Sequence, residues 1–194
     1  MIKDIPDIDI DTANRDEVLK HLEGYINATI GENHDARKHN TGVYVTDIPY
    51  DPRTGGATID HKRAEELGYI KLDILNMSVY EKVRDEAHLD SLISREPNWK
   101  RLWEDQEFCQ SVVHINNHYK SICVMQPDTL PRMAMFLALI RPDKKHLMGK
   151  SWKEVADDIW TKTDKYFFKK SHSISYSFLV AIHMNLLEES ENES

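Results

Sequence analysis

The sequence predicts an α+β fold in which a small mixed β-sheet comes first and a helical half follows. Two observations predict the sheet. Residues 5–11 alternate apolar and acidic side chains with a strand's period of two, and residues 69–75 form an apolar run with one acidic residue inside. A third observation predicts the helices, because apolar residues recur at helical spacing from Met77 onward. We therefore expect a sheet segment over residues 1–76 and a helical segment over residues 77–188, packed as one compact unit.

Short helices and turns separate the expected strands of the first segment. The spacing of Val18, Leu22 and Ile26 predicts a helix that ends near Gly31, and the polar residues 32–40 indicate a loop. Three further elements are expected: a strand over 42–47, a strand over 57–60 that returns after a turn, and a short helix over 62–67.

Several helices are expected in the second segment. They cover residues 79–92, 99–103, 127–140, 152–160 and 174–187. The last residues, 189–194, are mostly acidic and polar, and we expect a disordered tail there. The four tryptophans are expected to pack in or between these helices.

Composition excludes several classes of protein. With 194 residues, 40% hydrophobic and 30% charged, the chain is an ordinary globular protein. It has no run of about 18 apolar residues and no charged-then-apolar leader, so we expect a cytoplasmic protein without a membrane partner. The net charge of −8 argues against a surface that attracts nucleic acid everywhere. A cluster of lysines late in the chain is still compatible with a local basic channel; these are residues 144, 145, 150, 153, 162, 165, 169 and 170.

The first strand carries a row of carboxylates. Asp7, Asp9 and Asp11 alternate along it and therefore share one face, at intervals of roughly 6.5–7 Å. Two such carboxylates can share a pair of divalent cations, and ligands that are all oxygen suit Mg²⁺ or Mn²⁺. The alternative is an edge strand with a solvated acidic face.

Asp73 adds a third carboxylate inside an otherwise apolar strand. A buried carboxylate is costly unless a cation or hydrogen-bond donors compensate its charge. If the two strands are neighbours, Asp73 completes a three-carboxylate metal site with Asp9 and Asp11. The alternative is a local pairing of Asp73 with Lys71 or Arg63.

Five blocks of sequence, in the same order, resemble the family C DNA polymerases, whose bacterial and phage members include the DNA polymerase III α subunit. Residues 6–11 resemble the family's Pro-Asp-x-Asp-x-Asp motif, and residues 38–43 resemble its Lys-His-x-x-Gly-Val segment. Residues 68–75 are similar to its Gly-Leu-x-Lys-x-Asp-x-Leu strand. Residues 126–142 and 168–176 are similar to its fingers segments ending in Ala-Leu-x-Arg-Pro and containing Lys-Ser-His-Ser.

The resemblance implies a shortened palm-and-fingers core: a polymerase-β-like nucleotidyltransferase palm followed by helical fingers. It implies that Asp9, Asp11 and Asp73 are the catalytic residues and bind two Mg²⁺ ions, with Mn²⁺ as a substitute. It also implies a site for the incoming nucleotide, formed by Lys71, Arg141, Lys170, His172 and Tyr176.

The function implied by the resemblance is DNA-directed deoxynucleotidyl transfer in replication, with primer-template DNA and deoxynucleoside triphosphates as partners. The family's Gly-Ser phosphate-binding turn and its duplex-binding domains have no counterpart here. We therefore expect a streamlined phage-type enzyme in the bacterial cytoplasm, or one part of a split polymerase completed by a separate polypeptide. Two alternatives remain: an inactive polymerase-derived module that binds DNA or replication proteins, and a metal-dependent nuclease.

Two further motifs carry weaker signals. His114 and His118 are spaced to bind zinc if they lie on a helix, but no third ligand accompanies them, and a surface pair is favoured. Ser171-His172-Ser173 resembles part of a nucleophilic site, but adjacent residues do not form a catalytic triad.

Overall fold

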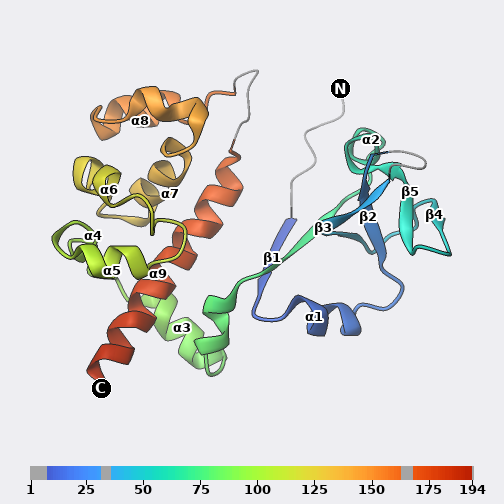
Figure 1. Ribbon diagram of the computed structural model, residues 1–194, viewed down its shortest axis with the longest axis horizontal. Helices are drawn as coiled ribbons and strands as arrows, with labels where there is room; N and C mark the ends of the chain where they lie inside the picture. Colours follow the sequence, from blue (N-terminus) through green and yellow to red (C-terminus); the bar gives the residue numbers. More distant parts are fainter. Residues whose placement is uncertain (1–7, 32–35, 163–167, 194) are drawn as a thin grey trace. The chain divides into compact units, whose positions relative to one another are not determined.

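The computed structural model describes residues 8–31, 36–162 and 168–193. The chain divides into two compact units, one up to Glu81 and the other from Lys82 onward (Figure 1). The first unit contains a six-stranded sheet with short helices, and the described elements of the second are helices. The predicted α+β class is therefore confirmed.

The sheet of the first unit is mixed, with the strand order β1-β6-β3-β2-β5-β4. β1 pairs with β6 in parallel and β2 with β5 in parallel, while the other neighbours are antiparallel. In chain order the elements are β1 (Ile8–Thr12), α1 (Arg15–His21), β2 (Ile26–Ile30), β3 (Arg37–Tyr44), β4 (Tyr50–Asp51), β5 (Gly56–Asp60), α2 (His61–Glu66), β6 (Leu72–Asn76) and the 3₁₀ helix Ser78–Lys82.

The helices α1 and α2 pack on opposite faces of this sheet. Leu19 of α1 packs against Val43 and Ile74, whereas Ala64 of α2 packs in a cluster that contains Tyr44. Because Val43 and Tyr44 are successive residues of β3, these two clusters must lie on opposite faces. Asp73, the neighbour of Ile74, consequently projects from the face that α2 covers.

The first helix is shorter than predicted. α1 begins after Asn14, whose side chain accepts hydrogen bonds from the backbone of Asp16 and Glu17, and it ends at His21. Gly24 follows with φ 69, a conformation that turns the chain easily only at glycine. The predicted helix beyond this point is wrong, because β2 (Ile-Asn-Ala-Thr-Ile) is rich in β-branched residues and pairs with both β3 and β5.

The strand predicted over 42–47 begins earlier, at Arg37. Residues 32–35 of the predicted loop lie outside the described residues, and residues 37–40 are strand rather than loop. The polar side chains of this stretch gave no apolar alternation, and its strand conformation depends on pairing with β2.

In the second unit a large hydrophobic cluster contains Trp99, and the other three tryptophans pack against it, as predicted. α7 and α9 are its central pair; the fully buried Ser173 of α9 donates a hydrogen bond to the carbonyl oxygen of Ala134 in α7 at 2.9 Å. The elements are α3 (Glu86–Ser94), α4 (Arg101–Glu104), α5 (Gln106–Ser111), α6 (Tyr119–Met125), α7 (Leu130–Leu139), the 3₁₀ helix Pro142–Leu147, α8 (Trp152–Asp158) and α9 (Lys170–Asn192).

The acidic end, predicted to be disordered, is helical up to Asn192. Glu189 pairs with His88 of α3 at 2.9 Å and with Arg95 at 3.2 Å, and Glu191 pairs with Arg101 at 2.5 Å. These ion pairs join residues far apart in the sequence, so the acidic composition alone could not indicate them.

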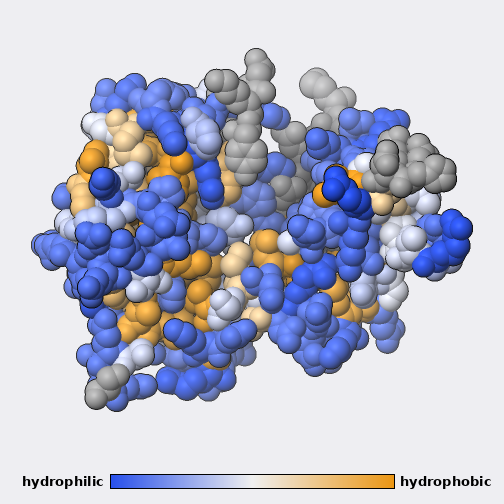
Figure 2. All heavy atoms as spheres, viewed as in Figure 1, coloured by the Kyte–Doolittle hydropathy of each residue, from blue (hydrophilic) through white to orange (hydrophobic). Residues whose placement is uncertain are grey.

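Hydrophilic residues cover much of the face shown in Figure 2, with apolar patches between them. Among the described helices, none is both long and apolar enough to cross a bilayer.

Candidate active site

Asp9 and Asp73 lie side by side at one edge of the sheet. β1 and β6 run in parallel, and the register pairs Asp9 directly with Asp73. Neighbouring strands are about 4.8 Å apart, and paired residues of parallel strands project to the same face. Asp11 follows two residues later on the same face, opposite Leu75. The condition for a shared site, that the two strands are neighbours, is therefore met. Asp7 lies outside the described residues.

The carboxylates of β1 are partly shielded from water, as one Oδ1 atom each of Asp9 and Asp11 is buried. Paired, shielded carboxylate oxygens are a donor set that fits a hard divalent cation. Within the described residues, however, no three His, Cys, Asp or Glu side chains gather closely enough to hold a metal ion. The convergence of Asp9, Asp11 and Asp73 on one metal pair thus stays a prediction.

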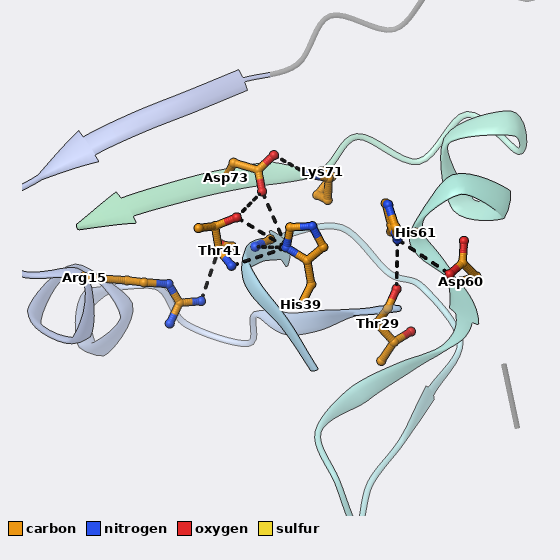
Figure 3. A network of polar contacts seen from close by, with 9 residues as sticks. Arg15, Thr29, His39, Thr41, Asp60, His61, Lys71 and Asp73 are labelled. Carbon is orange, nitrogen blue, oxygen red and sulfur yellow. Dashed lines mark hydrogen bonds and ion pairs between the residues drawn. The ribbon is translucent and has the colours of Figure 1, made fainter. Parts of the chain in front are cut away.

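Asp73 has two partners of its own (Figure 3). Thr41 Oγ1 donates a hydrogen bond to Asp73 Oδ1 at 2.7 Å, and the Lys71 ammonium forms an ion pair with Oδ2. Burial alone would raise the pKa of Asp73, but these two hydrogen bonds outweigh it and hold the pKa below its usual value. The local pairing weighed as an alternative is therefore present with Lys71, whereas Arg63 pairs with Glu66.

A bulge in β3 brings Thr41 to this place. Asn27 of β2 pairs with Val43 but Thr29 pairs with Lys38, so two steps along β2 correspond to five along β3. The additional residues of β3 include His39 and Thr41. Arg15 of α1 also holds this segment, since its Nη2 donates to the Thr41 carbonyl oxygen at 3.4 Å.

His39 closes the bulge as a neutral ring. Its Nδ1 accepts hydrogen bonds from the backbone N–H groups of Gly42 at 2.9 Å and Thr41 at 3.3 Å, so the proton of a neutral ring resides on Nε2. Burial first, and then the charge of Lys71, lower the pKa of His39. The 3.8 Å approach of Nδ1 to Asp73 Oδ1 is therefore a contact between two acceptors and not an ion pair.

Gly42, the residue that pairs with Asp73 on β3, leaves room for this network. A Cβ atom at this position would lie 2.7 Å from Lys71 Cδ and 3.0 Å from Ala28 Cβ. Any larger residue would therefore push against the side chain that pairs with Asp73.

A second histidine lies beside the first. His61, the first residue of α2, has Nδ1 3.2 Å from the Thr29 carbonyl oxygen, and its ring centroid is 5.1 Å from that of His39. Asp60 accepts backbone hydrogen bonds from Gly31 at 2.7 Å and from Lys62 at 2.9 Å. Asp60 therefore has a structural role: it caps the start of α2 and also holds the end of β2.

In the second unit, three of the predicted nucleotide-binding residues gather around Phe168. The Arg141 guanidinium lies 4.5 Å from the Phe168 ring centroid, and the rings of His172 and Tyr176 lie 6.1 Å and 5.9 Å from it. We call these four residues the Phe168 cluster. Lys170 lies instead over the Trp160 ring at 5.8 Å.

Arg141 has an unsatisfied donor in this cluster. Its Nε atom is buried and has no hydrogen-bond partner within the described ranges. A buried donor without an acceptor costs about 1–3 kcal/mol, and a ligand oxygen would remove that cost.

His114 is a neighbour of the Phe168 cluster that the sequence did not indicate. Its ring stacks on Tyr176, with the centroids 4.2 Å apart and the planes 16° from parallel. His114 is only partly exposed and its Nε2 atom is buried, so it is not the surface residue expected from the sequence. Burial, followed by the charge of Arg141, lowers the pKa of His114 to about 4. His39 and Gly42 had a signal in the Lys-His-x-x-Gly pattern. Thr41 had none, and His114 was indicated only by its zinc-like spacing to His118, not as a neighbour of Tyr176.

Comparisons with protein-family models, curated proteins and solved structures returned no match. The geometry of the two sites therefore carries the functional argument together with the motif resemblance.

Proposed function

We propose that the chain is a DNA polymerase of the family C type, or part of one, that transfers deoxynucleotides to a primer. The single observation that carries the proposal is the direct pairing of Asp9 with Asp73 across two parallel strands. The motif resemblance names the same two residues, with Asp11, as metal ligands. In such an enzyme the sheet would correspond to the nucleotidyltransferase palm.

Each residue of the sheet site has a role in this proposal. Asp9, Asp11 and Asp73 would hold Mg²⁺, which supplies the positive charge that stabilises the reacting phosphate oxygens. Thr41 orients Asp73 by its hydrogen bond, and the Lys71 ammonium reduces the repulsion between the carboxylates. His39 presents an Nε2–H donor, because its Nδ1 is occupied by the backbone.

The helical unit would contribute the nucleotide site. Arg141 offers a buried Nε–H donor without a partner in the described part of the chain, which suits a phosphate oxygen. Tyr176 offers a ring on which a base can stack. Lys170 and His172 would add cationic or hydrogen-bonding groups at the same helix, α9.

A second candidate function is an inactive, polymerase-derived binding module. One observation favours it: Asp73 already has a counter-charge, because Lys71 pairs with it. Such a module would bind DNA or replication proteins without turnover, and its carboxylates would need no metal.

The test is Mg²⁺-dependent primer extension by wild type, Asp9→Asn and Asp73→Asn, with Asp47→Asn as a matched control. Asp47 is an exposed residue of the same unit outside the carboxylate pair. We expect each site variant to lose at least about 100-fold in rate and the control to keep the wild-type rate.

The assay should also include a co-encoded polypeptide that carries the absent polymerase segments, where one is found. DNA binding without extension under either condition would refute the polymerase proposal and support the binding module. Primer degradation that requires Asp9 would instead support a nuclease.

A further inference from the structure

His114 occupies an unfavourable backbone conformation between α5 and α6. Its φ is 66, in the left-handed region that most residues avoid. The residues on either side hold it there: the Val113 N–H donates to His183 Nδ1 at 3.0 Å, and Ile115 is fully buried in the core. A strained residue persists when its surroundings determine the conformation, and such strain is concentrated at functional sites.

The side chain of His114 adds a second cost. Its Nε2 atom is buried without a hydrogen-bond partner among the residues described. Glycine or asparagine would accept the positive φ with less strain, and neither would bury an imidazole nitrogen. A histidine at this position therefore needs a compensation that its own loop does not provide.

The ring of His114 makes one favourable contact, a stack on Tyr176. The two rings are stacked at 4.2 Å with an angle of only 16°, and burial keeps the imidazole neutral near pH 7. A flat neutral ring can support a phenol ring over its whole face. Phe168 approaches the same phenol at 5.9 Å with a tilt of 40°.

We propose that His114 is a positioning residue that holds the Tyr176 ring ready to stack on the base of an incoming nucleotide. The inference rests on the proposed function for its ligand, and on the ring geometry for the positioning. Without the His114 ring, Tyr176 keeps its contact with Phe168 but loses the parallel stack on its face, so its ring has to be oriented further when the nucleotide binds. Ordering one side chain weakens binding by about 2- to 12-fold.

Three substitutions separate the contribution of the His114 ring from the effect of its positive φ. His114→Asn and His114→Gly tolerate the positive φ but remove the ring, whereas His114→Phe restores a ring without the nitrogens. We expect the first two to raise the nucleotide KM in primer extension by about 2- to 12-fold with kcat almost unchanged. His114→Phe should restore the wild-type KM. A loss of stability in the first two variants at wild-type KM would overturn the proposal.

A second measurement does not depend on polymerase activity. In protein labelled with ¹³C-tyrosine, the Tyr176 ring signal is assigned among the eight tyrosines by its disappearance in Tyr176→Phe. We expect His114→Asn to shift this signal and speed its ring flips, and His114→Phe to restore the slow flips. An unchanged Tyr176 signal in His114→Asn would overturn the positioning role. The expected NMR result, with no primer extension by wild type either alone or with the co-encoded polypeptide, would refute the polymerase proposal and still support the positioning of Tyr176.

Discussion

Replacing Gly42 with alanine tests the connection between the sheet backbone and the candidate active site. The added Cβ would lie 2.7 Å from Lys71 Cδ, 3.0 Å from Ala28 Cβ and 3.1 Å from His39 Nδ1. Overpacking of this kind costs about 1–3 kcal/mol. The reduced freedom of the unfolded chain offsets about 0.4–1 kcal/mol of that cost. We therefore expect Gly42→Ala to lower the free energy of unfolding by about 1 kcal/mol, within a range of about 0–2.6 kcal/mol.

A double-mutant cycle shows whether Lys71 is the residue that the new methyl group displaces. Lys71→Ala removes the closest contact, so Gly42→Ala should cost about 1 kcal/mol less in that background. Lys71→Ala also removes the counter-charge of Asp73. This loss is common to the single and the double variant that carry Lys71→Ala, so it cancels in the cycle. Gly56→Ala is the matched control, because its added Cβ would lie 3.1 Å from Thr29 Cγ2, a similarly close contact. Gly56 is on β5, which pairs with β2 and not with the strand that follows Lys71.

The assay is urea unfolding followed by far-ultraviolet circular dichroism, which detects the secondary structure of the sheet unit, because this unit contains no tryptophan. An equal cost of Gly42→Ala with and without Lys71 would refute the reasoning. Gly56→Ala should cost the same in both backgrounds.

Two further predictions concern pH and metal. Burial, followed by the charge of Lys82, lowers the pKa of His183 to about 4, below the value near 6.5 of the unfolded chain. The unfolded state therefore binds more protons between about pH 6.5 and pH 4, and stability should fall by about 2–3 kcal/mol as the pH drops through this window. Urea unfolding at several pH values should show a smaller loss for His183→Gln; an equal loss would contradict this. Saturating Mg²⁺ should raise the melting temperature of wild type and of Asp47→Asn but not that of Asp9→Asn. At a Mg²⁺ concentration of 100 Kd, bound metal stabilises the folded state by about 2.7 kcal/mol. A rise in Asp9→Asn equal to that of wild type would exclude Asp9 as a ligand.

The parts of the fold that could be predicted depend on local patterns. The alternation in β1 and the single acidic residue in β6 identified two strands. Whether these strands are neighbours was left open by the sequence, and the pairing of Asp9 with Asp73 answers it. The helices α7, α8 and α9 were found from apolar spacing, although their ends differ by a few residues.

The remaining features depend on contacts that a single segment does not encode. The apolar residues of β2 continue the helical spacing of α1, so the sequence pattern predicts one longer helix. The extended conformation of β2 comes from its pairing with the two neighbouring strands. The bulge that carries Thr41 to Asp73 results from the pairing of β3 with β2. Likewise, the positive φ of His114 is imposed by the residues that hold its loop, so no local pattern indicates its stack on Tyr176.

Among the strands that the structure describes, β1 lies at the end of the sheet, and this has a consequence for the solution behaviour of the protein. An outermost strand exposes backbone groups to which a strand of another molecule can add, and natural proteins oppose this with charged side chains. Asp9 and Asp11 supply that charge on one face, while Ile8 and Ile10 on the other face are each 38% exposed. The acidic residues proposed for catalysis therefore also discourage self-association, and replacing both with asparagine should make the protein more prone to aggregate.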